Sequence, residues 1–274
     1  MRRAVKSITG AVLGIGRGPP RAEADGMSAF VVGVVTARDP ACTRGVAANI
    51  AASLARTLGV SNRVCVIDAD PFNRDVTTRF AIRGPAIEDF GQPGAPPPHE
   101  CGRWDSPPCT VVPCAGDRPG PVRAGLAGAL GPLAAAHDVV VIDLPAGPMG
   151  PLAVVGERLA PLDCLLVGVT PAPESVAAAR HFLEQFAHAR ALGDIGPVPL
   201  EVICTGDEGS CECTCEEVGA ALGVEPAGRV HQWWGRAVPN LGFGPTLPIA
   251  ELDAAVVALC ERIAAPLEPL ITTS

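Results

Sequence analysis

The chain has 274 residues, 48% of them hydrophobic, which is enough to bury the core of one large domain or two small ones. Its 29 acidic and 21 basic residues give a formal net charge of -8, which argues against a general attraction to nucleic acid or anionic lipid. No apolar run approaches the roughly 20 residues of a membrane span. We therefore expect a globular, cytoplasmic protein whose 11 cysteines are mostly reduced thiols.

Residues 1–27 precede the first strand-like run and are expected to form a flexible tail, because "GRGPPRAEADG" has the composition of a linker. Within this tail, residues 1–18 space apolar side chains along one helical stripe beside basic residues, as membrane-binding segments do. Internal glycines weaken such a helix, so a disordered tail is the favoured interpretation. Met27 is an alternative start of the protein.

Apolar runs with the length of buried strands recur along the chain. They lie at residues 29–36, 63–70, 109–116, 138–145, 164–170 and 200–206. Helical patterns lie at 40–58, 120–136, 173–191, 214–222 and 249–265. Strands that alternate with helices predict an α/β fold with a doubly wound, mostly parallel sheet and helices on both faces, here over residues 28–265.

Two segments of this chain are expected to lie outside the regular elements. Residues 83–108 are dense in proline and glycine, which predicts a long surface loop inside the domain. Residues 266–274 are expected to form a C-terminal tail without basic amphipathic character. The sequence thus predicts one domain between two tails.

The stretch "TARDPACTRGVAANIAASLA" (36–55) has the strand, loop and helix order of a phosphate-binding loop. Two later strands end in acidic residues, "VCVIDADP" with Asp70 and "VVVID" with Asp143. In this order and spacing, the three segments resemble the ParA/MinD family of dimerising P-loop ATPases over roughly residues 29–265. The resemblance implies that Asp70 is the switch I aspartate that activates water, and that Asp143 is the Walker B aspartate that acts on magnesium through water.

The loop itself departs from the family. The family's K-G-G-V-G-K-T falls without gaps on residues 38–44, where none of the seven residues matches. Thr43 replaces the phosphate-binding lysine, Arg44 replaces the magnesium-binding hydroxyl, and Pro40 has no N–H. We therefore expect a pseudo-ATPase with no cofactor, in which Asp70 and Asp143 are vestigial. The alternative is an active ATPase that binds ATP and magnesium through Arg38, Thr43, Arg44 and Gly45.

The same loop has features of a helix start. Asp is a preferred N-cap and Pro a preferred first helical residue, so we expect a helix that begins at Pro40 and is capped by Asp39. The Asp39 carboxylate would then take the place of a phosphate. The alternative is an ordinary capped helix with no ancestral site. For Asp70 and Asp143, the alternatives are solvated carboxylates, helix caps or structural ion pairs.

A cysteine cluster lies in "GDEGSCECTCEE", where Cys211, Cys213 and Cys215 alternate with other residues. Three thiolates with a fourth ligand from elsewhere can hold zinc or an iron–sulfur cluster, which makes a metal carrier a further hypothesis. This spacing is not common among metal ligands, so a mobile acidic loop with reduced thiols is the favoured interpretation.

The segment "VHQWWGRAV" places Trp233 and Trp234 beside Arg236. Such residues stack on a base or anchor a protein partner, although one of two adjacent tryptophans can equally pack in the core. Taken with the resemblance, the sequence predicts a positioning or scaffold protein of a secretion, pilus or division machine. The expected partner is another protein of that machine, a second copy of the chain is an alternative partner, and nucleic acid is not an expected partner.

Overall fold

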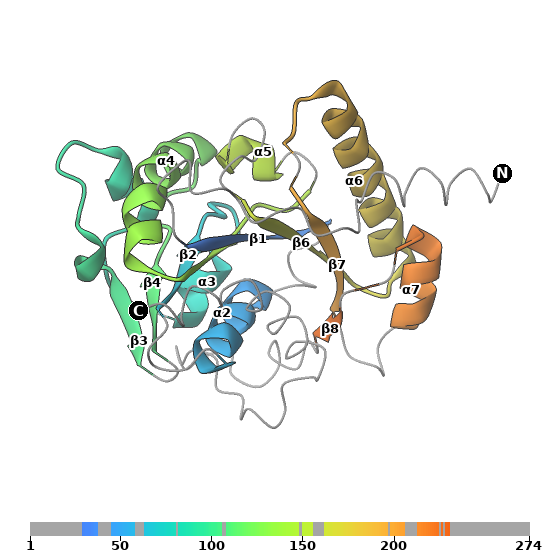
Figure 1. Ribbon diagram of the computed structural model, residues 1–274, viewed down its shortest axis with the longest axis horizontal. Coiled ribbons are helices and arrows are strands. Elements are labelled where there is room, and N and C mark those ends of the chain that lie inside the picture. The colour runs from blue at the N-terminus through green and yellow to red at the C-terminus, as the bar shows by residue number, and fades with distance from the viewer. Residues whose placement is uncertain are drawn as a thin grey trace, which may run out of the picture.

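The computed structural model describes residues 29–37, 45–57, 63–80, 82–105, 108–147, 150–155, 162–196, 198–205, 213–224, 226 and 228–230. They form an eight-stranded sheet with helices on both faces (Figure 1). This confirms the predicted α/β fold with a doubly wound, mostly parallel sheet. The tails at 1–27 and 266–274 and the helix predicted at 249–265 lie outside the described residues.

The strands follow the spatial order β3-β4-β2-β5-β1-β6-β7-β8. They are β1 (Phe30–Thr36), β2 (Val64–Asp68), β3 (Gly102–Asp105), β4 (Pro108–Val112), β5 (Val139–Asp143), β6 (Cys164–Val169), β7 (Leu200–Thr205) and β8 (Gly228–Val230). All neighbouring pairs are parallel except β3 and β4, which are antiparallel. Because β1 lies between β5 and β6, the strand order reverses at the centre of the sheet, which is where α/β folds bind their ligands.

Helices cover the sheet from two sides. They are α2 (Val46–Thr57), α3 (Asp75–Phe80), α4 (Pro119–Ala136), α5 (Gly150–Val155), α6 (Pro173–Leu192) and α7 (Cys215–Leu222). Figure 1 shows α4, α5 and α6 on one face and α2 and α3 on the other. On β5, Val140 and Ile142 belong to the core under α4 to α7, and Val139 and Val141 to the core under α2 and α3. Burial on both faces explains why the strands are apolar at nearly every position.

Residues 83–108 are not the plain surface loop that their composition predicts. They contain two short 3-10 helices, η3 (Ile87–Gly91) and η4 (Pro98–Glu100), and strand β3. Ile87 and Phe90 are buried against α4, where two glycines allow the close approach. A Cβ atom on Gly125 would lie 1.9 Å from the Ile87 carbonyl oxygen, and one on Gly128 would lie 2.2 Å from that of Phe90. The loop prediction was wrong here because this burial depends on Gly125 and Gly128 of α4, each 38 residues beyond its partner in η3 (125 − 87 and 128 − 90).

Helix α2 begins at Val46 and not, as predicted, at Pro40. Gly45 precedes the helix with φ 81, a left-handed conformation that glycine adopts without strain. The Gly45 carbonyl accepts the first helical hydrogen bond, from the Asn49 N–H at 2.8 Å. Asp39 lies outside the described residues, so its predicted role in place of a phosphate remains a prediction.

Candidate functional site

Polar side chains gather at the carboxyl edge of the sheet, on the face that α2 covers. Asp68 of β2 lies opposite Asp143 of β5 in the register, and both continue the alternation of strand residues that pack against α2. By the same alternation, Thr36 of β1 and Thr170, just beyond β6, lie on this face. We call these four residues the polar row. Because α2 follows β1 in the chain, its N-terminus lies at this same edge.

Asp68 is the most buried carboxylate among the described residues, with 0% of its surface exposed. It accepts hydrogen bonds from the Thr77 N–H at 2.8 Å, the Thr77 hydroxyl at 2.7 Å and the Asp70 N–H at 3.2 Å. Burial raises the pKa of Asp68 to about 7; the bonds from Thr77 and from the Asp70 N–H lower it, and the Asp70 charge raises it. Sequence reasoning missed Asp68, although the D-x-D pattern of Asp68 and Asp70 was a signal that pointed to it.

Asp70 holds its own turn together. One carboxylate oxygen accepts from the Phe72 N–H at 2.9 Å and the Asn73 N–H at 3.2 Å, and the other accepts from the Asn73 side-chain amide at 2.6 Å. Only 5% of the residue is exposed. The turn ends at Arg74, whose φ of 49 is uncommon for a residue with a side chain. These bonds are those of a carboxylate that caps a turn.

The other members of the polar row are Asp143, Thr36 and Thr170, and they differ in their surroundings. The structure brings Asp143 beside Asp68, and its side chain is half-buried. The hydroxyl oxygens of Thr36 and Thr170 are buried and have no hydrogen-bond partner in the described part of the chain. Thr170 itself is only 6% exposed. Buried hydroxyls without partners are rare and indicate that water or a ligand belongs beside them.

The N-terminus of α2 is contacted by a carboxylate from another helix. The Gly45 N–H donates to the carboxylate of Asp75, the first residue of α3. By resemblance Gly45 directly follows the phosphate loop, so its N–H is one of those that face phosphates in a working site. The predicted cofactor-binding residue Gly45 therefore has its amide bonded within the protein. Sequence reasoning missed Asp75, because no local pattern links residues 30 positions apart.

The remaining predicted site residues are described only in part. Outside the described ranges lie Arg38, Asp39, Thr43, Arg44, Cys211, Trp233, Trp234 and Arg236. Cys213 and Cys215 lie at the start of α7 as free, half-buried thiols. Within the described ranges, no three His, Cys, Asp or Glu side chains are grouped as metal ligands. None of the described helices is both long and apolar enough to cross a lipid bilayer.

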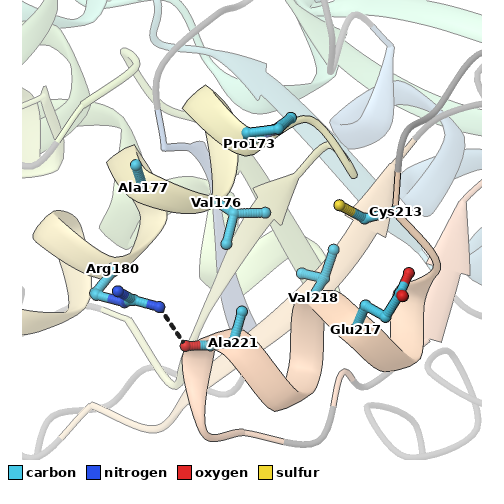
Figure 2. Close-up of a pocket in the computed structure, with 8 residues that line it drawn as sticks. All are labelled: Pro173, Val176, Ala177, Arg180, Cys213, Glu217, Val218 and Ala221. Carbon is cyan, nitrogen blue, oxygen red and sulfur yellow. Dashed lines mark hydrogen bonds between the residues drawn. The ribbon is translucent and has the colours of Figure 1, made fainter.

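A separate pocket of about 260 Å³ lies between α6 and α7 (Figure 2). It is lined by Pro173, Val176, Ala177, Arg180, Cys213, Glu217, Val218 and Ala221. Its charged residues already stabilise α7. The Arg180 guanidinium donates to the Ala221 carbonyl at 2.8 Å, and the Glu217 carboxylate accepts from the Thr214 N–H at 2.7 Å. The polar row therefore remains the candidate site.

No protein-family model and no curated protein sequence matches the chain. Among solved structures, a chain of the MinC:MinD cell division protein complex of Aquifex aeolicus is 17% identical, with a TM-score of 0.63, over 86% of this chain and 96% of that chain. A complex of a Cyanothece McdA variant with ATP is 16% identical, with a TM-score of 0.61, over 88% and 97%. A ParA family ATPase of Chlorobium tepidum TLS is 18% identical, with a TM-score of 0.60, over 75% and 84%. These likenesses cover between 75% and 88% of this chain, so they are not confined to one motif.

Proposed function

We propose that this chain, which has the fold of the ParA/MinD P-loop ATPases, is a pseudo-ATPase. It positions or scaffolds components of a secretion, pilus or division machine through protein–protein contacts, and it pairs with a second copy of itself. It has no nucleotide cofactor in this role. One solved structure of the same fold is the MinC:MinD complex, a precedent for a partner protein bound to this fold.

The observation that carries the proposal is that the Asp70 carboxylate already accepts hydrogen bonds within its own turn. A residue that activates water must offer a free acceptor to the attacking molecule. In this protein the two carboxylate oxygens of Asp70 accept hydrogen bonds from three donors of the same turn. Hydrogen bonds to a charged group contribute roughly 1.5–3 kcal/mol each, so releasing Asp70 for catalysis would cost much of the turn's stability.

ATP with magnesium fits the described residues poorly. The Gly45 N–H, which faces phosphate in a working loop, donates to Asp75. The lysine position holds Thr43 and the hydroxyl position holds Arg44, so two of the groups that neutralise and bind the phosphates and the metal are missing from the sequence.

One observation favours a second candidate, an active ATPase with an atypical loop. Thr36 and Thr170 keep buried hydroxyls without partners among the described residues, at the edge where a nucleotide would lie. In this alternative Arg38, Thr43 and Arg44 would contact the phosphates, and Asp143 would act on magnesium through water.

Calorimetric titration of the full chain with ATP and with ADP, in the presence of magnesium, separates the two candidates. The pseudo-ATPase proposal expects a Kd no tighter than about 1 mM for either nucleotide, because several charge-assisted bonds to phosphate are missing. A saturable isotherm in the micromolar range would overturn it and support the active ATPase.

A further inference from the structure

We propose that the groove between α6 and α7 is the docking site of the chain's own residues 1–18, which bind it as a short basic amphipathic helix. This groove is the pocket of about 260 Å³ shown in Figure 2. In the docked state the groove and the segment hide each other's apolar surface from other molecules. The docking site is separate from the polar row, because α6 lies on the opposite face of the sheet from α2 (Figure 1).

The groove is lined mainly by small and apolar side chains of the two helices. Pro173, Ala177 and Ala221 are exposed along it, while Val176 and Val218 are buried beneath them. Its volume lies below the roughly 300–1,000 Å³ of pockets that hold small molecules. The groove therefore suits a few aliphatic side chains of a peptide segment better than a cofactor, as when an amphipathic helix binds in an apolar groove.

The two helices around the groove carry an excess of negative charge. Their side chains include the carboxylates of Glu174, Glu184, Glu216 and Glu217 against the guanidinium groups of Arg180 and Arg190. Glu217 lines the groove, and the exposed Glu184 lies one turn beyond Arg180 on the same row of α6. Such a rim attracts a basic segment and opposes a second copy of the same surface, so charge selects the occupant.

Residues 1–18 have the composition that this rim attracts. They contain three arginines, one lysine and no acidic residue. Their helical stripe is about 15 Å long and consists of Val5, Ile8, Val12 and Ile15. The α6 wall of the groove, from Pro173 to Glu184, has nearly the same length of about 16 Å. Because internal glycines weaken this helix in isolation, the segment gains order only when its apolar stripe is buried.

The chain between the segment and β1 is long enough to reach the groove. Residues 19–28 span up to about 33 Å when extended. The groove begins at Pro173, just beyond the carboxyl end of β6, and β6 is next to β1. The path from the start of β1 runs roughly 23 Å along the strand, about 10 Å across to β7 and about 10 Å out to the helices. The direct distance is thus about 27 Å, which the linker spans.

Lys6 is the only lysine in the chain, which makes it a specific probe of docking. A carbodiimide activates a carboxylate, and the Lys6 amine then displaces the urea to form an amide where the two groups are in contact. The full chain is treated as an equal mixture of ¹⁴N- and ¹⁵N-labelled protein, and linked tryptic peptides are identified by mass spectrometry. We expect Lys6 to be linked to carboxylates of α6 and α7, Glu184 and Glu217 among them, in peptide pairs of a single isotope.

Two pairs of variants test the two surfaces. Ile8→Ser removes an apolar residue from the stripe, and Leu13→Ser removes one outside it. Ala177→Gln fills the groove, and Ala191→Gln places the same side chain at an exposed position in the last turn of α6. We expect Ile8→Ser and Ala177→Gln to lower the yield of the link at least about fivefold, because each removes apolar burial, and both controls to keep the wild-type yield.

Equal yields in the wild type and all four variants would show that neither surface is needed, and this would overturn the inference. Links between ¹⁴N and ¹⁵N peptides would assign the groove to a second copy, and Lys6 links confined to carboxylates outside α6 and α7 would place the segment elsewhere. Either result also contradicts the inference. If Ala177→Gln does not fold, as judged by circular dichroism, Ile8→Ser decides alone because it leaves α6 and α7 unchanged. Micromolar ATP binding would contradict only the proposed function.

Discussion

Asp68 and Asp143 are register partners at the carboxyl ends of two adjacent parallel strands, and both side chains lie on the face that α2 covers. Two carboxylates in such a position repel each other when both are ionised. Burial raises the pKa of Asp68 to about 7, so part of the folded molecules hold this carboxyl group protonated at neutral pH. The protonation of one buried carboxyl group is thereby linked to the stability of the candidate site.

Asp68→Asn should change how stability depends on pH. The pKa of Asp68 is about 7 in the folded protein against 3.8 for an unperturbed group. The folded state therefore holds an extra proton between these values, and its stabilisation is complete below pH ~4 and lost as pH rises through ~7. We expect the wild type to lose a few kcal/mol relative to Asp68→Asn between pH 5 and 8, measured by urea unfolding. Parallel pH curves for the two proteins would show that Asp68 does not titrate in this range.

His137 should give the folding stability a dependence on pH opposite to that of Asp68. It is 6% exposed, its Nδ1 lies 2.8 Å from the Leu133 carbonyl, and its Nε2 lies 2.8 Å from the Thr110 hydroxyl. Burial lowers the pKa of His137 below its usual 6.5, so the unfolded state takes up the proton first and stability falls as pH drops below ~6.5. In His137→Gln this loss should be absent, as measured by unfolding at pH 7 and pH 5 against the wild type. An unchanged difference between the two pH values would contradict the assignment.

Asp143→Ala should alter stability or partner binding but no turnover, because the proposed pseudo-ATPase has no turnover to lose. Its side chain ends β5 beside Asp68, so its removal changes the electrostatics of the polar row. The measurement is phosphate release from ATP by the wild type and the variant at matched purity. Release that is present in the wild type and disappears in Asp143→Ala would contradict the pseudo-ATPase proposal.

Gly125→Ala should destabilise the fold by roughly 1–3 kcal/mol, because its Cβ would lie 1.9 Å from the Ile87 carbonyl oxygen and force η3 away from α4. Gly131→Ala is the control on the same helix, since its Cβ meets no atom within 4 Å. Alanine there should be neutral or stabilise the helix by up to about 1 kcal/mol. Urea unfolding of both variants measures the contrast, and equal stabilities would mean that η3 is not held tightly against α4.

The sequence alone was enough to place most of the sheet and its covering helices. Strands such as β5 and β6 are buried on both faces, so each is a continuous apolar run that can be recognised in the sequence without knowing its neighbouring strands. Helix α6 begins with a proline in its first turn and is followed by Gly193 with φ 80, both local signals of helix boundaries. Properties that arise within about ten residues of chain were thus predictable.

What only the tertiary structure decided depends on residues that are distant in the sequence. Strand β3 requires its pairing with β4, and the burial of Ile87 requires α4. Helix α2 starts after Gly45, whose N–H donates a hydrogen bond to the distant Asp75. The pKa of Asp68 is raised because other elements exclude water from it, and the strand register alone sets Asp143 beside it. Burial and long-range hydrogen bonds are properties of the packed chain, so local sequence patterns do not contain them.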